Sequence, residues 1–126
     1  MRHLILDTLP INDRDMSYLK DLHKLEKLTL GTCPISDKGV AHLAGLKRLK
    51  HLDLWETEVT DAGVRSLQNI QSLEYLDLTN TNVTDASIDS FLALPNLRDL
   101  FIGGTKISDA GAERLQKMRP KLELNR

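Results

Sequence analysis

Apolar residues recur along this chain with a period of 24 residues. The five copies begin at Met1, Leu25, Leu49, Leu73 and Leu97. Once the copies are aligned, seven columns hold an apolar residue in every copy. In the first copy these columns are Met1, Leu4, Leu6, Ile11, Met16, Leu19 and Leu22. A fixed period of this length predicts similar structural units that stack on one another.

Two different spacings of apolar residues occur within each unit. Leu52 and Leu54 alternate with polar residues, which predicts a strand with one covered face, whereas Val64, Leu67 and Ile70 lie three apart and predict one stripe of a helix. Each unit is therefore expected to be a strand, a turn and a helix. The predicted units are 1–24, 25–48, 49–72, 73–96 and 97–121, followed by an end strand at 122–126.

A single unit of this kind cannot bury its own apolar stripe, but stacked units bury a continuous one. We therefore expect residues 1–126 to form one domain of the α/β class. Its predicted architecture is a curved solenoid, with a parallel sheet on the concave side and helices on the convex side.

A polar residue followed by aspartate stands at each predicted helix start. The five pairs are Asn12-Asp13, Ser36-Asp37, Thr60-Asp61, Thr84-Asp85 and Ser108-Asp109. The first residue can accept a hydrogen bond from a free N–H of the first turn, and the aspartate suits the positive end of the helix dipole. Helix capping explains these recurring aspartates better than catalysis does.

The segment Leu52 to Val64, with the sequence LDLWETEVTDAGV, resembles a leucine-rich repeat of the ribonuclease-inhibitor-like class. It is similar to the TDAG-type repeats that are common in bacterial multi-repeat proteins, and the resemblance covers essentially the whole chain. It implies a strand and a full helix in every unit, and a surface that binds other molecules. It does not identify the ligand, because the family has many unrelated partners.

Two columns depart from this pattern. Leu9 stands where the other units have Cys33 or a threonine, and Asp15 and Ser87 stand where the other units have glycine. Because serine and aspartate occur at the glycine position, that position does not require a positive φ angle. We expect the glycines there to serve close packing.

Composition narrows the function classes. The net charge of -1 and the absence of a long apolar run argue against binding to nucleic acid or membranes. No signal peptide is visible. The single cysteine, Cys33, excludes an internal disulfide and is compatible with a reducing compartment, so a cytoplasmic location is favoured for the sequence as it stands, while the compartment stays open. Cys33 is expected to be a small buried residue.

Three of the five aromatic residues fall on predicted outward positions of the strands: Trp55, Tyr75 and Phe101. Neighbouring strands lie about 4.8 Å apart, so these rings are expected to lie together, interleaved with aspartates. The predicted recognition patch comprises His51, Asp53, Trp55, Glu56, Tyr75, Asp77, Asp99 and Phe101. Its expected partner is a protein or peptide that offers arginine or lysine. The alternative is that these rings are ordinary surface residues that cover the sheet.

The sequence gives little support for a catalytic site or a metal site. Asp53 and Asp77 are laterally adjacent, which can raise the pKa of one of them, but an open sheet does not exclude water. His3 and His51 lie two strands apart, with Lys27 between them, which is the wrong geometry for zinc. We therefore expect no catalytic residue, no metal and no cofactor.

The resulting hypothesis is a non-enzymatic interaction module that binds a protein or peptide through its concave face. One alternative is a substrate-recognition or regulatory domain of a larger enzyme. Another is a self-associating structural repeat, because the first predicted strand starts near residue 3 without a polar cap and can pair with a second chain. The sequence that flanks this segment in its gene tests the first alternative. Sizing or ultracentrifugation at a series of concentrations tests the second.

Overall fold

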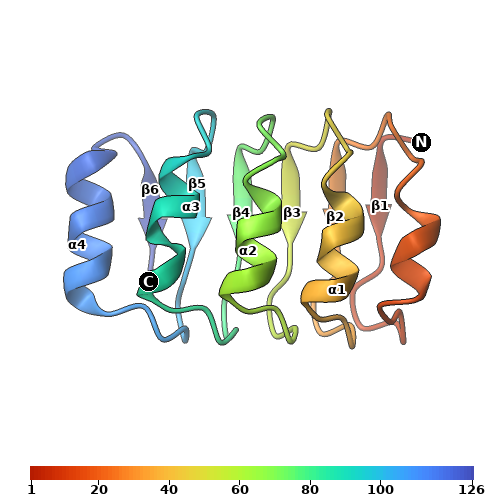
Figure 1. The fold of residues 1–126 in the computed structure, drawn as a ribbon, viewed down its shortest axis with the longest axis horizontal. Coiled ribbons are helices and arrows are strands. Elements are labelled where there is room, and N and C mark those ends of the chain that lie inside the picture. Colours follow the sequence, from red (N-terminus) through yellow and green to blue (C-terminus); the bar gives the residue numbers. More distant parts are fainter.

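Six short strands form one parallel sheet whose order follows the chain (Figure 1). The computed structural model describes all residues 1–126. The strands are β1 (His3–Ile5), β2 (Lys27–Thr29), β3 (His51–Asp53), β4 (Tyr75–Asp77), β5 (Asp99–Phe101) and β6 (Glu123–Asn125). Residues 24 apart are paired throughout, for example Leu4 with Leu28 and Leu28 with Leu52. The predicted parallel sheet is confirmed.

The helical segments differ in length from unit to unit. The α-helices are α1 (Asp37–Val40), α2 (Asp61–Leu67), α3 (Ile88–Leu92) and α4 (Asp109–Met118), and the 3₁₀ segments are η1 (Asp15–Tyr18), η2 (Ala41–Leu43) and η3 (Asp85–Ser87). The expectation of a full helix in every unit is wrong for the first one, which contains η1 alone. Asp15, Ser17 and Tyr18 in η1 all have low helix propensity, which is consistent with this short turn.

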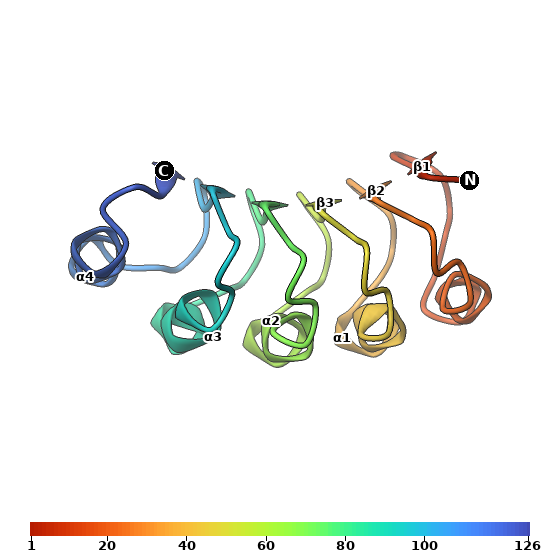
Figure 2. The same ribbon diagram turned by 90° about the horizontal axis from the view of Figure 1, so that it is seen from above.

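The units follow one another along an arc, with the sheet on the inside and the helices on the outside (Figure 2). Neighbouring strands need only about 4.8 Å between them, whereas packed helices need about 8–10 Å, so a stack of such units must bend toward its strands. The predicted solenoid with a concave sheet is confirmed. None of its helices combines the length and the apolar composition needed to cross a lipid bilayer.

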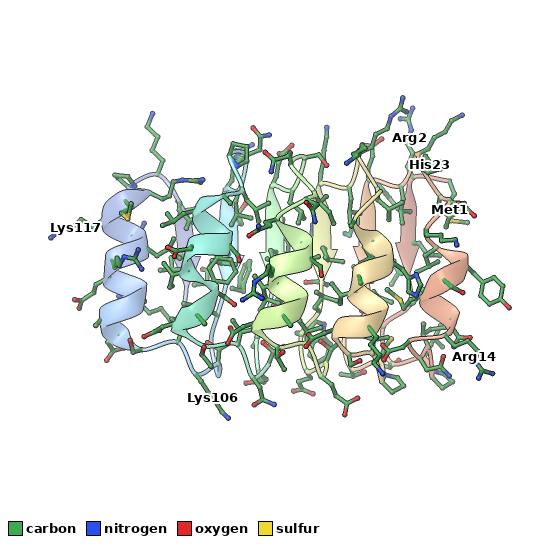
Figure 3. The ribbon with its side chains drawn as sticks, viewed as in Figure 1. Met1, Arg2, Arg14, His23, Lys106 and Lys117 are labelled. Atoms are coloured by element: carbon green, nitrogen blue, oxygen red, sulfur yellow. The ribbon has the colours of Figure 1, made fainter.

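Side chains are drawn along the whole stack in Figure 3, and 30 buried hydrophobic residues among them form one cluster. In the three middle units all seven apolar columns are buried, as predicted. The end units differ, since Met1 is 71% exposed and Met118 is 57% exposed. A column residue is buried only where a neighbouring unit packs against it.

The aspartates that follow the predicted helix caps bind the next unit. The backbone N–H of Thr60 donates to Asp37 Oδ1 at 2.7 Å and its hydroxyl donates to Asp37 Oδ2 at 2.5 Å. The same pair of bonds joins Asp13 to Ser36, Asp61 to Thr84 and Asp85 to Ser108. We call these four aspartates the aspartate ladder. The hydrogen bonds of the ladder link each unit to the one before it.

The ladder corrects part of the capping prediction. Asn12, Thr84 and Ser108 do accept hydrogen bonds from N–H groups of their own first turns. Ser36 and Thr60 make no such bond, although their hydroxyls donate across to the preceding unit. Sequence reasoning missed this role because it treated each unit separately.

The ladder also explains the glycine column. A Cβ on Gly39, Gly63 or Gly111 would overlap the carboxylate of Asp13, Asp37 or Asp85, respectively. None of the three glycines has a positive φ angle, so the expectation that they serve close packing is confirmed. Ser87 replaces glycine in the fourth unit, where its hydroxyl donates to Asp61 Oδ1 at 2.5 Å.

Candidate functional site

Two columns of side chains face the hollow of the arc, because only the middle residue of each strand points into the core. The first column is His3, Lys27, His51, Tyr75, Asp99 and Glu123, and the second is Ile5, Thr29, Asp53, Asp77, Phe101 and Asn125. The predicted patch residues all lie on β3, β4 and β5 or on the turn after β3. The strand register places Asp53 beside Asp77, and Tyr75 between His51 and Asp99.

A continuous row of rings crosses these three strands. The rings of His51 and Tyr75 are stacked, with centroids 3.9 Å apart and an interplanar angle of 8°. Tyr75 and Phe101 follow with centroids 5.1 Å apart and an angle of 44°. All three side chains belong to partly exposed residues. The sequence placed Tyr75 and Phe101 together correctly, but it did not identify the histidine as the third ring of the row.

Trp55 does not join this row. Its indole ring lies over Gly31 of the preceding unit, where a Cβ atom would overlap it. The expectation that Trp55 lies together with Tyr75 and Phe101 is therefore corrected. The signal was present in the sequence, since Gly31 stands in the same column as Trp55 one unit earlier and leaves room for a large ring.

Two carboxylates lie beside the ring row and differ in their surroundings. Asp77 Oδ1 accepts hydrogen bonds from Thr79, at 2.9 Å from the backbone N–H and 2.6 Å from the hydroxyl. The Asp53 side chain is only 17% exposed, and its Oδ1 is buried without a hydrogen-bond partner. Burial and the negative charge of Asp77 raise the pKa of Asp53 to about 6.

The ring row is uncharged near neutral pH. Burial and the charge of Lys27 lower the pKa of His51, whose Nε2 lies 3.5 Å from Asp53 Oδ2. Burial and the negative charges of Asp53, Asp77 and Asp99 raise the pKa of Tyr75 to about 12, so its phenol keeps its proton. The centre of the concave face thus combines neutral rings with carboxylates.

Thr29 belongs to this site although the sequence analysis did not select it. It is paired with Asp53 in the sheet, it is only 4% exposed, and its hydroxyl has no hydrogen-bond partner. Glu56, by contrast, is exposed at the rim, where its Oε1 accepts a hydrogen bond from Asn80 at 3.3 Å. The only available signal for Thr29 was its position next to Asp53 in the same column.

No enclosed cavity lies over these residues. The largest hollow, about 860 Å³, opens between residues 95–99 and residues 119–123, and Arg98, Asp99, Arg119 and Lys121 are among its lining residues. It includes neither Asp53 nor Tyr75. No group of three or more histidine, cysteine, aspartate or glutamate side chains is arranged to hold a metal ion. The geometry suits surface recognition of another molecule.

Comparisons with known proteins agree with the fold. Profiles described as leucine rich repeat match residues 21–44 and 47–107. Internalin C2 of Listeria monocytogenes is 28% identical, with 86% of this chain and 44% of that chain covered and a TM-score of 0.68. A leucine-rich repeat protein of Leptospira interrogans is 23% identical, with 87% of this chain and 27% of that chain covered and a TM-score of 0.67.

A further similar structure is a second Listeria monocytogenes internalin, internalin F, which is 18% identical. In that comparison 99% of this chain and 47% of the internalin are covered, with a TM-score of 0.61. The chain therefore spans less than half the length of each of the three proteins. No curated protein matches this sequence.

Proposed function

This chain belongs to the leucine-rich repeat family, and from that premise we propose that it is a non-enzymatic module that binds a protein or peptide through its concave sheet face. Leucine-rich repeat domains generally mediate protein–protein interactions. The observation that carries the proposal is the row of His51, Tyr75 and Phe101 on the open face. Rings on a solvent-facing sheet add little to the core, whereas aromatic side chains often anchor interfaces.

The charges beside the row favour a cationic ligand. The arginine ion pairs of the chain involve Glu26, Glu74, Asp89 and Asp109, so none of them neutralises Asp53, Asp77 or Asp99. His51 is close to Asp53, but its lowered pKa keeps it neutral. Arginine or lysine side chains of a ligand can pair with these carboxylates and lie against the rings.

A ligand screen with matched variants tests the proposal. Proximity labelling or pull-down is carried out with the wild type, with the double variant Trp55→Ala/Tyr75→Ala, and with Tyr18→Ala. Tyr18 is the matched control because it is 77% exposed and lies on η1, away from the concave face. Ligands that bind the wild type and Tyr18→Ala should bind the double variant at least about tenfold more weakly. Equal binding to all three proteins contradicts the proposal.

Self-association is a second candidate, favoured by the apolar surface of the first unit. Met1, Ile5 and Leu9 are between 45% and 71% exposed, and Ile5 lies on the edge strand β1. A dimer through this surface should appear in a sedimentation concentration series and be lost in Ile5→Lys. A monomer at all concentrations contradicts this candidate and leaves the concave-face proposal unaffected.

A further inference from the structure

Two buried polar atoms in this protein lack a hydrogen-bond partner, and they belong to neighbouring residues. They are Thr29 Oγ1 and Asp53 Oδ1, on residues that the sheet register pairs directly. The other fully buried threonines, Thr57 and Thr81, both donate to backbone carbonyl oxygens at 2.7 Å. Because buried polar atoms almost always have partners, two unsatisfied ones side by side mark a polar position on the concave face that the chain itself leaves incomplete.

We propose that this place is a subsite for one arginine side chain of the ligand, held by Asp53, Thr29 and Asp77 beside the paired rings of His51 and Tyr75. This inference rests on the proposed function, because it assigns a position to the cationic group of the same ligand. The subsite spans β2, β3 and β4 at the centre of the sheet.

The chemistry of the acceptors selects a guanidinium group. Asp53 Oδ1 requires a donor, the Thr29 hydroxyl can accept a hydrogen bond as well as donate one, and Asp77 uses Oδ1 for its bonds to Thr79. A guanidinium group offers five donors in one plane and can serve several acceptors at once, whereas the ammonium group of lysine offers three donors and is more strongly hydrated. The Asp53 side chain is only 17% exposed, and partial burial of this kind strengthens an ion pair.

The surrounding charges leave this subsite negative. Asp7, in the segment after β1, directs its Oδ1 to the N–H of Gly31 at 2.7 Å and adds to the negative charge around Asp53. Asp77 on β4 lies on the opposite side of Asp53, and Lys27 on β2 provides the facing positive charge. The charge of Asp99 on β5 raises the pKa of Tyr75, and the charge of His3 on β1 lowers the pKa of His51. One cation from a ligand therefore reduces the repulsion among the carboxylates.

Arginine binding should depend on pH. Arginine binds the ionised carboxylate of Asp53, which takes up a proton as the pH falls through about 6. Protonation of His51 below its ordinary pKa adds a positive charge beside Asp53 and acts in the same direction. Affinity should thus be highest above pH 7 and fall as the solution is acidified to pH 5.

Nuclear magnetic resonance titration of the full chain with N-acetyl-arginine amide tests the subsite directly. At pH 7.5 we expect saturable shift changes centred on Thr29, Asp53, Tyr75 and Asp77. The apparent Kd should be about tenfold higher at pH 5, and N-acetyl-lysine amide should bind several-fold more weakly than the arginine probe. No saturation, or changes centred elsewhere on the protein, overturns the subsite.

Two variants and one matched control complete the test. Asp53→Asn and Thr29→Val should each weaken binding of the arginine probe, Asp53→Asn by about tenfold or more. Asp109→Asn is the control, since Asp109 has a 97% exposed side chain outside the concave face. Spectra of the free variants verify that each is folded. Unchanged binding to Asp53→Asn overturns the proposal.

The two proposals fail separately. If a protein ligand binds in a Tyr75-dependent way while the arginine probe does not bind at Asp53, the subsite is wrong and the proposed function stands. If the arginine probe binds at Asp53 while no protein ligand depends on the concave face, the subsite stands and the proposed function is wrong.

Discussion

The aspartates of the ladder and Asp53 on the concave face are the same residue type in opposite situations. In the ladder, Asp61 accepts bonds from the N–H and hydroxyl of Thr84 and from the hydroxyl of Ser87. On the concave face, Asp53 leaves Oδ1 without any partner and stands beside a second carboxylate. One carboxylate is satisfied by its own chain, whereas the other is not.

The pKa values of these aspartates shift in opposite directions. Burial alone would raise the pKa of Asp61, but the hydroxyls of Ser87 and Thr84 and the Thr84 N–H hold it below its ordinary value. The hydroxyl and N–H of Ser108 likewise lower the pKa of Asp85. Burial and the charge of Asp77 raise the pKa of Asp53 to about 6. The comparison indicates that Asp61 and Asp85 stabilise the fold as carboxylates, while Asp53 costs stability in its ionised form.

The largest expected effect comes from breaking the ladder. Asp61→Ala removes three hydrogen bonds to a charged acceptor and leaves their donors without partners, so the free energy of unfolding should fall by about 3 kcal/mol. Urea denaturation measures this loss. Asp109→Ala is the control, because the Asp109 side chain is 97% exposed and meets only Arg126 at 3.4 Å; its effect should stay within about 0.5 kcal/mol. Similar losses of stability in both variants would show that the hydrogen bonds of the aspartate ladder are unimportant.

Adding a methyl group against the ladder should be the next most damaging change. Gly63→Ala places a Cβ into the carboxylate of Asp37, and overpacking of this kind costs about 2 kcal/mol, although alanine favours a helix. Thermal and urea unfolding measure the effect. Gly45→Ala, where no atom lies within 4 Å of the added Cβ, should be neutral or slightly stabilising. A neutral Gly63→Ala would contradict the close packing of glycine and aspartate.

Neutralising Asp53 should stabilise the protein in a pH-dependent way. Because its pKa is raised to about 6 from 3.8, its favourable contribution is fully present below about pH 4 and is lost as the pH rises through about 6. Asp53→Asn should therefore raise the free energy of unfolding by about 1–2 kcal/mol at pH 8. The gain should disappear at pH 4. Urea denaturation at both pH values is the measurement, and an equal effect at both excludes titration of Asp53 as its cause.

The smallest expected effect compares two buried threonines. Thr29→Val removes a hydroxyl that has no partner, so stability should be unchanged or higher by up to about 1 kcal/mol. Thr81→Val removes a hydroxyl that donates to Leu78 O at 2.7 Å, so stability should fall by about 1 kcal/mol. Opposite signs in urea denaturation support the contrast. A loss in Thr29→Val as large as that in Thr81→Val would show that the Thr29 hydroxyl is already satisfied.

Much of the architecture followed from the 24-residue period. The period identified the core residues of the middle units, the parallel strand register and the concave side of the sheet. It failed at the ends of the stack, where Met1 and Met118 are exposed and the first unit has a 3₁₀ turn in place of an α-helix. Met1 and Met118 are exposed because each lies at an end of the stack, where a neighbouring unit packs on one side only.

The candidate site was predictable only in part. The columns placed Asp53 beside Asp77 and Tyr75 near Phe101, because the register fixes which residues are neighbours. They did not reveal that the indole ring of Trp55 lies over Gly31, that His51 stacks on Tyr75, or that the hydroxyl of Thr29 lacks a partner. These features depend on side-chain orientation, which spacing along the chain does not contain.

By itself the sequence determined the repeating layers of this protein, because burial of apolar columns at strand and helix spacing allows one stacking arrangement. The tertiary structure alone decided what each aspartate does. Asp37 and Asp53 lie on either side of the same unit boundary, yet the first meets the N–H and hydroxyl of Thr60 and the second meets another carboxylate. Hydrogen bonding and desolvation act over a few ångströms in space, so only the folded arrangement of neighbouring units sets them.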